Sequence, residues 1–310
     1  MTAQGVPRLI FSGAATMDFI YRVRRLPSGG GKILPYDLIE VAHGMASSAA
    51  AAAARLGACA TLFARVGDDG VGARFVSDME AAGVDCRHVR RLSGVRTPLS
   101  TVLIDDGGER LVVPYYDPNL GTNPDWPPLD EIATADGVLV DVRWPQGASV
   151  VLEAARRAGI PALLDADVGP IDSLVDLVER ASHVVFSEPA ALAVSGEPQV
   201  ESATRRLAER FACLVAVTAG ERGCFWVEDR RLRQLKPPPV EAIDTLAAGD
   251  VFHGAFLIGL VEGASLAKTI AFANAAAAIK CTRFGGRLGA PTREEVDALL
   301  VASQEARNEN

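Results

Sequence analysis

Residues 244–256 of this 310-residue chain read Asp-Thr-Leu-Ala-Ala-Gly-Asp-Val-Phe-His-Gly-Ala-Phe. The small side chains at 247–249 let a backbone turn approach a ligand closely, and the apolar residues that follow predict a buried helix. The first amides of a helix lack intrahelical acceptors, so such a turn is a ready anion site. The same pattern fits a capped core helix with a glycine-rich entry, and the spacing alone leaves both readings open.

Asp250 lies in the first turn of this predicted helix, where its carboxylate would repel a bound anion. It makes chemical sense as a base, because a carboxylate beside an alcohol accepts the hydroxyl proton while the amides stabilise a transferring phosphoryl group. His253, one turn further into the apolar helix, is interpreted as a packing residue rather than a base.

Around this segment, short apolar runs alternate with helical stretches. Apolar runs with little alternation are typical of parallel strands buried on both faces, so the order predicts a doubly wound α/β core. The strand-like runs are 8–12, 60–66, 137–142, 162–165, 183–187 and 214–218, and the helical stretches are 47–56, 71–82, 148–158, 201–210 and 249–260.

Two stretches, 18–42 and 97–118, do not follow this alternation of strand-like runs and helices. Residues 101–104 and 110–113 flank Asp-Asp-Gly-Gly at 105–108, which predicts a hairpin. A small β layer over one edge of the core is the simplest interpretation, with 119–128 as the extended return to the main body. We therefore predict a core of 1–17, 43–96 and 119–310 and a discontinuous β layer of 18–42 and 97–118.

The composition excludes several classes of protein. With 49% hydrophobic and 23% charged residues the chain is too apolar to remain disordered, and no apolar run approaches the ~18 residues of a membrane span. A net charge of −8 without a basic patch argues against a nucleic-acid partner. The five widely spaced cysteines form neither a zinc pattern nor a disulfide framework, and no signal peptide is seen, so we expect a cytoplasmic protein.

Three further motifs accompany the 244–250 run. They are His-Gly-Met at 43–45 with the helix ending at 54–57, the Gly-Asp-Asp-x-x-Gly element within 66–72, and the glycine-rich loop of 217–223. Together the four motifs resemble those of the ribokinase-like (PfkB) carbohydrate kinases, whose second signature, Asp-Thr-x-Gly/Ala-Ala-Gly-Asp, is similar to the 244–250 run. The matches extend from about Ile10 to Pro291. The resemblance implies a three-layer, mostly parallel α/β fold in which the small β layer is a lid.

The resemblance also implies roles for individual residues. Asp250 would be the catalytic base, and the amides of Ala247, Ala248 and Gly249 would form the anion hole, with Ala247 in place of the commoner glycine. The ATP phosphates would lie against Thr218, Gly220 and Gly223. Asn274 would border the adenine pocket, or else serve as a helix-packing amide.

On the sugar side, the resemblance places Asp18 where the family binds sugar hydroxyls, which suits a carboxylate that accepts from two neighbouring hydroxyls. His43 and Gly44 would line the same pocket, and Ser48 stands where the family usually has asparagine. Gly31, in the loop of the lid, would assist.

Three runs, at 141–144, 187–189 and 280–287, resemble the bacterial 6-deoxy-6-sulfofructose kinases beside the ribokinase branch. In that branch Arg143 would face a sulfonate or phosphate, because a planar guanidinium suits such a group. The alternative is an ion pair between Arg143 and a carboxylate at the edge of the core. Pro114 departs from the branch, since a polar anion contact is expected there.

The cations implied by the resemblance are Mg²⁺, which neutralises charge between the phosphates, and a monovalent ion such as K⁺. The family's Asn-x-x-Glu element for Mg²⁺ would fall at residues 187–190, where Glu188 is the only acidic residue. Asp244 and carbonyls near 246, 280, 283 and 285 match the positions of the monovalent ion. Lys280, if turned inward, would compete with that ion.

The leading hypothesis is an ATP-dependent kinase acting on a primary hydroxyl of a ketose-like or anionic sugar, of sulfofructose, fructose, ribose or sugar-acid type. A nucleoside kinase of the same family is the alternative enzyme. A non-catalytic sugar- or nucleotide-binding regulator is the alternative of another class, since fold does not fix function. The resemblance implies a homodimer formed through the lid.

Overall fold

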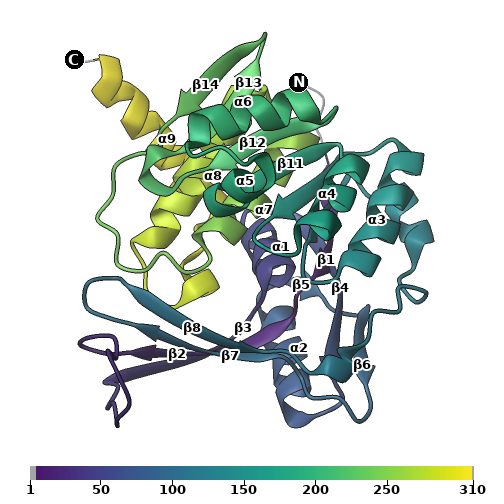
Figure 1. Ribbon diagram of the computed structural model, residues 1–310, viewed down its shortest axis with the longest axis vertical. Helices are drawn as coiled ribbons and strands as arrows, with labels where there is room; N and C mark the ends of the chain where they lie inside the picture. Colours follow the sequence, from purple (N-terminus) through teal and green to yellow (C-terminus); the bar gives the residue numbers. More distant parts are fainter. Residues whose placement is uncertain (1–4, 309–310) are drawn as a thin grey trace.

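The computed structural model describes residues 5–308 of the chain, and it consists of two β-sheets with helices packed on both faces of the larger one (Figure 1). The large sheet has ten strands, with the order β14-β13-β12-β11-β10-β9-β1-β4-β5, and β6 also pairs with β4. Their bounds are β1 Arg8–Gly13, β4 Cys59–Gly67, β5 Val84–Asp85, β6 Val89–Leu92, β9 Gly137–Asp141, β10 Ala162–Ala166, β11 His183–Ser187, β12 Leu214–Thr218, β13 Cys224–Glu228 and β14 Arg231–Leu235.

The strands from β12 to β5 pair in parallel, and the antiparallel hairpin β13–β14 forms the opposite edge. Side chains alternate between the two faces of each strand: Leu9 and Phe11 of β1 belong to one hydrophobic cluster, and Ile10 belongs to the other. The predicted three-layer, mostly parallel α/β fold is therefore confirmed.

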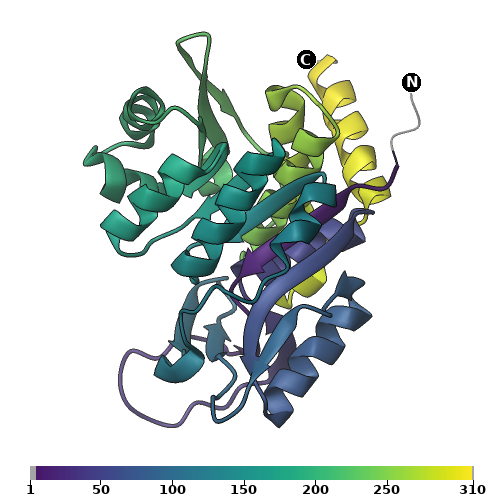
Figure 2. The ribbon, with the colours of Figure 1, turned by 90° about the vertical axis from the view of Figure 1, so that its right-hand side faces the viewer.

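Helices from different parts of the chain cover the two faces, as the turned view shows (Figure 2). One face carries α1 Met45–Arg55, α2 Gly70–Ala81, α7 Ala248–Val261, α8 Leu266–Cys281 and α9 Arg293–Asn308, and the other carries α3 Pro145–Ala158, α4 Ile171–Arg180, α5 Glu188–Ser195 and α6 Val200–Arg210. Short 3-10 turns lie at Pro118–Leu120, Leu129–Thr134, Gly220–Arg222 and Gly286–Gly289. No helix among the described residues is both long and apolar enough to span a membrane.

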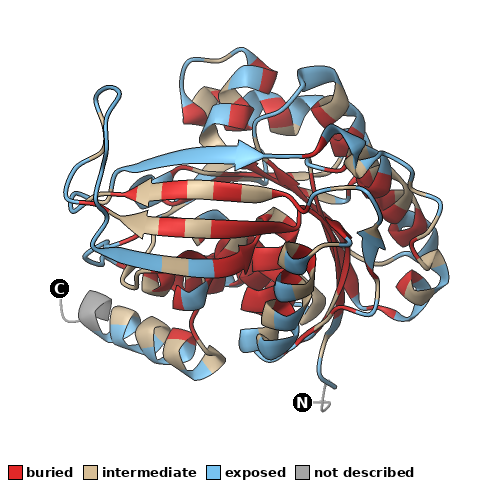
Figure 3. Cartoon of the chain, turned by 90° about the horizontal axis from the view of Figure 1, so that it is seen from below, coloured by how far each residue is buried: buried red, intermediate tan, exposed pale blue. Residues whose placement is uncertain are grey.

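The second, smaller sheet has four strands in the order β3-β2-β7-β8. Figure 3 shows it from below, with β8 exposed along its length and the inner strands partly buried. Their bounds are β2 Thr16–Arg22, β3 Asp37–His43, β7 Leu99–Ile104 and β8 Arg110–Tyr115, so the predicted hairpin of 101–113 is confirmed. Its buried residues Ile20, Val41 and Val102 pack against Leu246 and Phe284, which brings the small sheet over the turn that precedes α7.

Candidate active site

Polar side chains gather where the parallel strands of the large sheet end. Asp141 is the last residue of β9, Ser187 the last of β11 and Thr218 the last of β12, and Asp165 lies beside Asp141 in the register of β9 and β10. The order of the sheet reverses between β1 and β9, because the chain runs from β1 to β4 on one side and from β9 to β12 on the other. Ligands of open α/β sheets bind beyond the carboxyl ends at such a point.

Asp141 joins three segments at this switch point, a role that the sequence did not reveal. Its carboxylate accepts from the amides of Ala14 (2.8 Å), Ala46 (2.9 Å) and Arg143 (2.8 Å). Ala46 is in the first turn of α1, so the carboxylate also serves the free amides of that helix end. A Cβ at Gly13 would lie 2.2 Å from this carboxylate, which explains the glycine at the end of β1.

The turn before α7 has the free amides that an anion needs. Ala247 adopts the left-handed conformation (φ 64°), and the amide of Ala248 donates to the carbonyl of Thr245 at 3.2 Å. Within residues 5–308, the amides of Ala247, Gly249 and Asp250 donate to no carbonyl or side chain. A Cβ at Gly249 would meet nothing within 4 Å, so the space over the turn is open. These donors fit the phosphate groups of a nucleotide.

Asp250 is half-buried behind this turn. Burial, followed by the negative charges of Asp165, Asp141, Asp167 and Asp18, raises its pKa well above the usual range of a carboxyl. A raised pKa makes the ionised carboxylate a stronger base, which favours the transfer of a hydroxyl proton to it.

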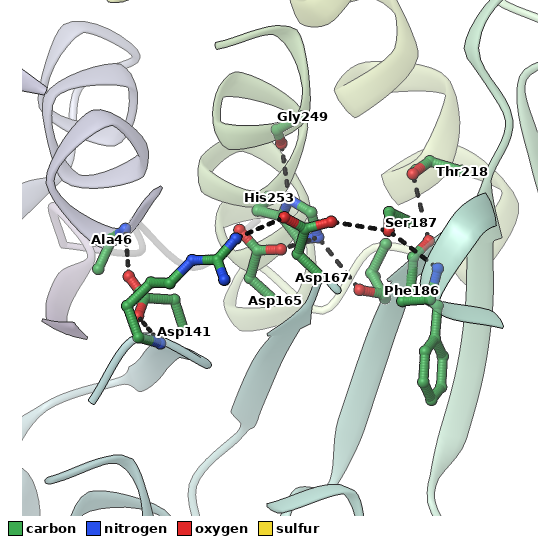
Figure 4. A network of polar contacts seen from close by, with 12 residues as sticks. Ala46, Asp141, Asp165, Asp167, Phe186, Ser187, Thr218, Gly249 and His253 are labelled. Atoms are coloured by element: carbon green, nitrogen blue, oxygen red, sulfur yellow. Dashed lines mark hydrogen bonds and ion pairs between the residues drawn. The ribbon is translucent and has the colours of Figure 1, made fainter. Parts of the chain in front are cut away.

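His253 connects the turn to the large sheet (Figure 4). Its Nδ1 lies 2.6 Å from the carbonyl oxygen of Gly249, and its Nε2 faces the carbonyl of Val185 (3.3 Å) and Oδ1 of Asp165 (3.4 Å). The ring is 3% exposed, and burial lowers its pKa. The prediction that His253 packs in the core is confirmed.

The small sheet contributes Asp18 and His43, which are neighbours on β2 and β3. Asp18 Oδ1 accepts from the hydroxyls of Thr16 (3.1 Å) and Ser100 (2.7 Å), and Oδ2 lies 3.4 Å from His43 Nδ1. All of them are buried, and His43 Nε2 has no partner among the described residues. Ser100 was missed because it lies 82 residues away in sequence.

Three further predicted sugar residues have different surroundings. Ser48 is buried in α1, and its hydroxyl has no partner within the described part of the chain. Gly44 precedes α1 with φ 111°, and a Cβ there would lie 2.4 Å from the carbonyl oxygen of Ala14. Gly31 instead lies in the exposed loop between β2 and β3, beyond the paired Arg22 and Asp37, and makes none of the polar contacts of the site.

Arg143 makes an ion pair at the edge of the core (Figure 4). Its guanidinium contacts Asp167 Oδ2 (3.0 Å) and the carbonyl of Val168 (3.0 Å), and the other oxygen of Asp167 accepts from Ser187 Oγ (2.9 Å). Arg143 was predicted either to face an anionic group of the substrate or to pair with a carboxylate at the edge of the core. The structure shows the ion pair. Asp167 follows β10 directly and was not among the predicted site residues.

The predicted nucleotide residues lie at the ends of β12 and β14. Thr218 Oγ1 donates to the carbonyl of Phe186 (3.2 Å), and the turn that follows begins at Gly220, which has φ 55° and open space around it. A Cβ at Gly223 would lie 2.0 Å from the carbonyl oxygen of Leu235, so this glycine is needed for chain packing. The amide nitrogen of buried Asn274 donates to the same carbonyl of Leu235 (2.8 Å).

Glu188 begins α5 and forms an ion pair with Arg222 of the glycine-rich turn. Magnesium binds through one or two carboxylates together with water and phosphate oxygens, so it needs no cage of protein ligands. No cluster of three His, Cys, Asp or Glu side chains among the described residues could hold a metal on its own. A single carboxylate beside the nucleotide loop fits this mode of Mg²⁺ binding.

Asp244 does not fit as a ligand of K⁺ in this structure. The ammonium of Lys280 lies 2.5 Å from its carbonyl oxygen and 3.1 Å from its carboxylate oxygen Oδ2. Lys280 is therefore turned inward, in the space where the resemblance places the monovalent ion.

Comparison with known proteins agrees with this arrangement. The model of the pfkB family carbohydrate kinases matches residues 7–293. An ATP-dependent ribose-1-phosphate kinase of Halopiger xanaduensis is 30% identical over 94% of this chain and 98% of its own, and ribokinase of Bacillus subtilis is 27% identical over 93% and 97%. A solved structure of a ribokinase candidate from Agrobacterium tumefaciens is 44% identical and superposes with a TM-score of 0.95 over 97% of this chain and 99% of its own. The chain therefore belongs to the pfkB family of carbohydrate kinases.

Proposed function

We propose that the protein transfers the γ-phosphoryl group of ATP to a primary hydroxyl of a ketose-like sugar. One observation carries the proposal: Asp250, with its raised pKa, stands in the first turn of α7 beside the free amides of Ala247 and Gly249. In this role Asp250 accepts the proton of the sugar hydroxyl while the amides of Ala247 and Gly249 hold the transferring group. The amide of Ala248, which was predicted to belong to the same anion hole, donates instead to the carbonyl of Thr245.

The nucleotide would lie along the ends of β12 and β14. Thr218, Gly220 and Gly223 form the turn proposed to hold the phosphates, and Asn274 borders the adenine beyond it. Glu188 is the proposed side chain for Mg²⁺, and the bound ion supplies positive charge between the phosphates. Its ion pair with Arg222 ties that carboxylate to the phosphate turn.

Asp18, His43, Gly44 and Ser48 are the residues proposed to bind the sugar. The unpartnered Ser48 hydroxyl and His43 Nε2 are buried polar groups, which a sugar hydroxyl would satisfy. Neutral sugars such as fructose and ribose suit this pocket better than anionic ones, because carboxylates surround it and Arg143 is already paired with Asp167. An anionic sugar would require Arg143 to leave that ion pair.

We further propose that segments 18–42 and 97–118 act as a lid over a core formed by 1–17, 43–96 and 119–310. The lid carries Asp18 to the pocket, and its closure would exclude water from the transfer. The exposed apolar side chains of this sheet and its loop support the proposed homodimer through the lid; they are Leu34, Tyr36, Leu38, Leu111, Val112, Val113 and Tyr115. All five cysteines are free, which supports the proposed cytoplasmic location.

A coupled ADP-release assay tests the function. The purified protein is screened with Mg·ATP against fructose, ribose, sulfofructose, sugar acids, sugar phosphates and nucleosides. We expect sugar-dependent ADP release that is highest with a neutral ketose or pentose. Release with nucleosides alone would instead identify a nucleoside kinase, and no release with any acceptor would favour a non-catalytic binding protein.

A further inference from the structure

The side chain of Lys280 is fully buried at the end of α8, an unusual place for a lysine. Its ammonium lies 2.5 Å from the carbonyl oxygen of Asp244, 3.1 Å from Asp244 Oδ2 and 3.5 Å from the carbonyl oxygen of Arg283. An ammonium has three donors and no acceptor, and three oxygens face it here. Each N–H donor of a charged Lys280 side chain therefore has an oxygen acceptor.

These oxygens belong to the two segments that hold the anion-binding turn in place. Asp244 begins the stretch that leads directly to 247–249, and its carboxylate accepts from the amides of Leu246 (2.8 Å), Gly285 (3.0 Å) and Gly286 (2.9 Å). Asp244 is itself 1% exposed. A buried carboxylate is stable only when a positive charge or several donors compensate it, and Lys280 supplies that charge.

A monovalent metal ion and the ammonium exclude each other at this position. Both carry one positive charge and both would use the oxygens of Asp244 and Arg283, so a second cation would meet the repulsion of the first at close range. The small sheet closes the same region from outside, because Leu246 and Phe284 pack against its buried face. Arg110 of β8 adds another cation there, donating to Thr245 Oγ1 at 2.8 Å.

We propose that Lys280 is the built-in cation of this kinase: its ammonium holds the 244–249 turn in the conformation that binds the transferring phosphoryl group, so the enzyme requires no K⁺. This inference rests on the proposed function only for the test of kcat. The test by thermal midpoint rests on the geometry around Lys280 alone. Lys280 touches no substrate atom in this account, and it acts as a positioning residue through Asp244.

The first test compares the wild-type protein in 100 mM KCl and in 100 mM tetramethylammonium chloride, at constant Mg·ATP and sugar. We expect kcat to agree within about twofold, and the thermal midpoint of the protein without ligands to be the same in both salts. A several-fold activation by K⁺, or a thermal midpoint raised by K⁺, would overturn the proposal.

The second test removes the ammonium with Lys280→Ala. Without its cation the Asp244 oxygens become available, so we expect kcat to fall at least tenfold in tetramethylammonium and to recover in KCl, and K⁺ to raise the thermal midpoint of this variant only. Lys268→Ala is the matched control, because Lys268 is an exposed lysine of the same helix. A folded Lys280→Ala variant whose kcat and thermal midpoint do not change with K⁺ would contradict the proposal.

The two readouts separate this proposal from the proposed function. If no sugar is phosphorylated, the thermal midpoints of the wild type and of Lys280→Ala in the two salts still decide whether the ammonium occupies a cation position. If Lys280→Ala does not fold, the comparison of salts on the wild type still decides whether the protein responds to K⁺.

Discussion

The substitution Asp165→Asn removes a buried carboxyl group near the end of β10 while keeping the size of the side chain. Asp165 is 3% exposed, and its Oδ2 has no partner among the described residues. Burial, and after it the charges of Asp141 and Asp167, raises its pKa well above the usual range. The ionised form is therefore unfavourable in the folded protein, and an uncharged amide should be more stable at neutral pH.

The sign and size of the effect follow from proton linkage. Because the pKa of Asp165 is higher in the folded state, the folded protein holds one more proton than the unfolded chain above about pH 4, the usual pKa of an aspartate. Each such proton lowers the free energy of unfolding by up to about 1.4 kcal/mol per pH unit as the pH rises, until the folded pKa is passed. The asparagine has no such proton, so its advantage over the wild type grows with pH through this window.

Urea unfolding followed by circular dichroism at pH 5, 6, 7 and 8 measures this difference. We expect the free energy of unfolding of Asp165→Asn to exceed that of the wild type by an amount that increases from pH 5 upward. Asp136→Asn, at an exposed aspartate before β9, should show no pH-dependent gain. A difference for Asp165→Asn that is flat with pH, or that falls as the pH rises, would show that Asp165 does not hold an extra proton in the folded protein.

Substitutions at Ala247 and Asp141 test the left-handed turn before α7 and the switch point of the large sheet. Ala247→Gly should keep both stability and turnover, because glycine adopts φ 64° freely. Ala247→Val should lose about 1–2 kcal/mol of stability and most of its turnover, because a β-branched residue is strained in this conformation. Urea unfolding and the ADP-release assay measure the two effects. Equal behaviour of the two variants would mean that the left-handed turn is not required. Asp141→Ala leaves three amides without an acceptor, so we expect a loss of at least about 2 kcal/mol in urea unfolding, against about 1 kcal/mol or less for Asp136→Ala, which frees only the amide of Arg8. Equal losses for these two variants would show that the Asp141 network contributes nothing beyond a surface contact.

Much of the core could be predicted from the sequence because its strands are short, apolar and rich in β-branched residues. The bounds of β11 and β12 agree with the predicted runs 183–187 and 214–218. The hairpin β13–β14 was missed, since β14 reads Arg-Leu-Arg-Gln-Leu and lacks the apolar character of a buried strand. Helix α5 was missed as well, because its eight residues follow β11 without a loop.

The site was less accessible to sequence reasoning because long-range contacts build it. Asp141 holds amides that lie 127 and 95 residues away in the chain, and no local pattern indicates either contact. The role of Gly31 stays a prediction, since this glycine lies in the exposed loop between β2 and β3 and no contact in the structure tests it. Resemblance to a family supplied candidate positions, while the partners of Arg143 and Lys280 emerged only from the folded arrangement.

The proposed transfer depends on Asp250 accepting the proton of the acceptor hydroxyl. The most direct test is the kcat of Asp250→Asn with the best sugar found in the ADP-release screen, measured at saturating ATP on protein whose thermal midpoint and ATP affinity are those of a folded enzyme. A general base contributes about 10²–10⁴-fold, so kcat should fall by that factor. A kcat close to that of the wild type would contradict the account.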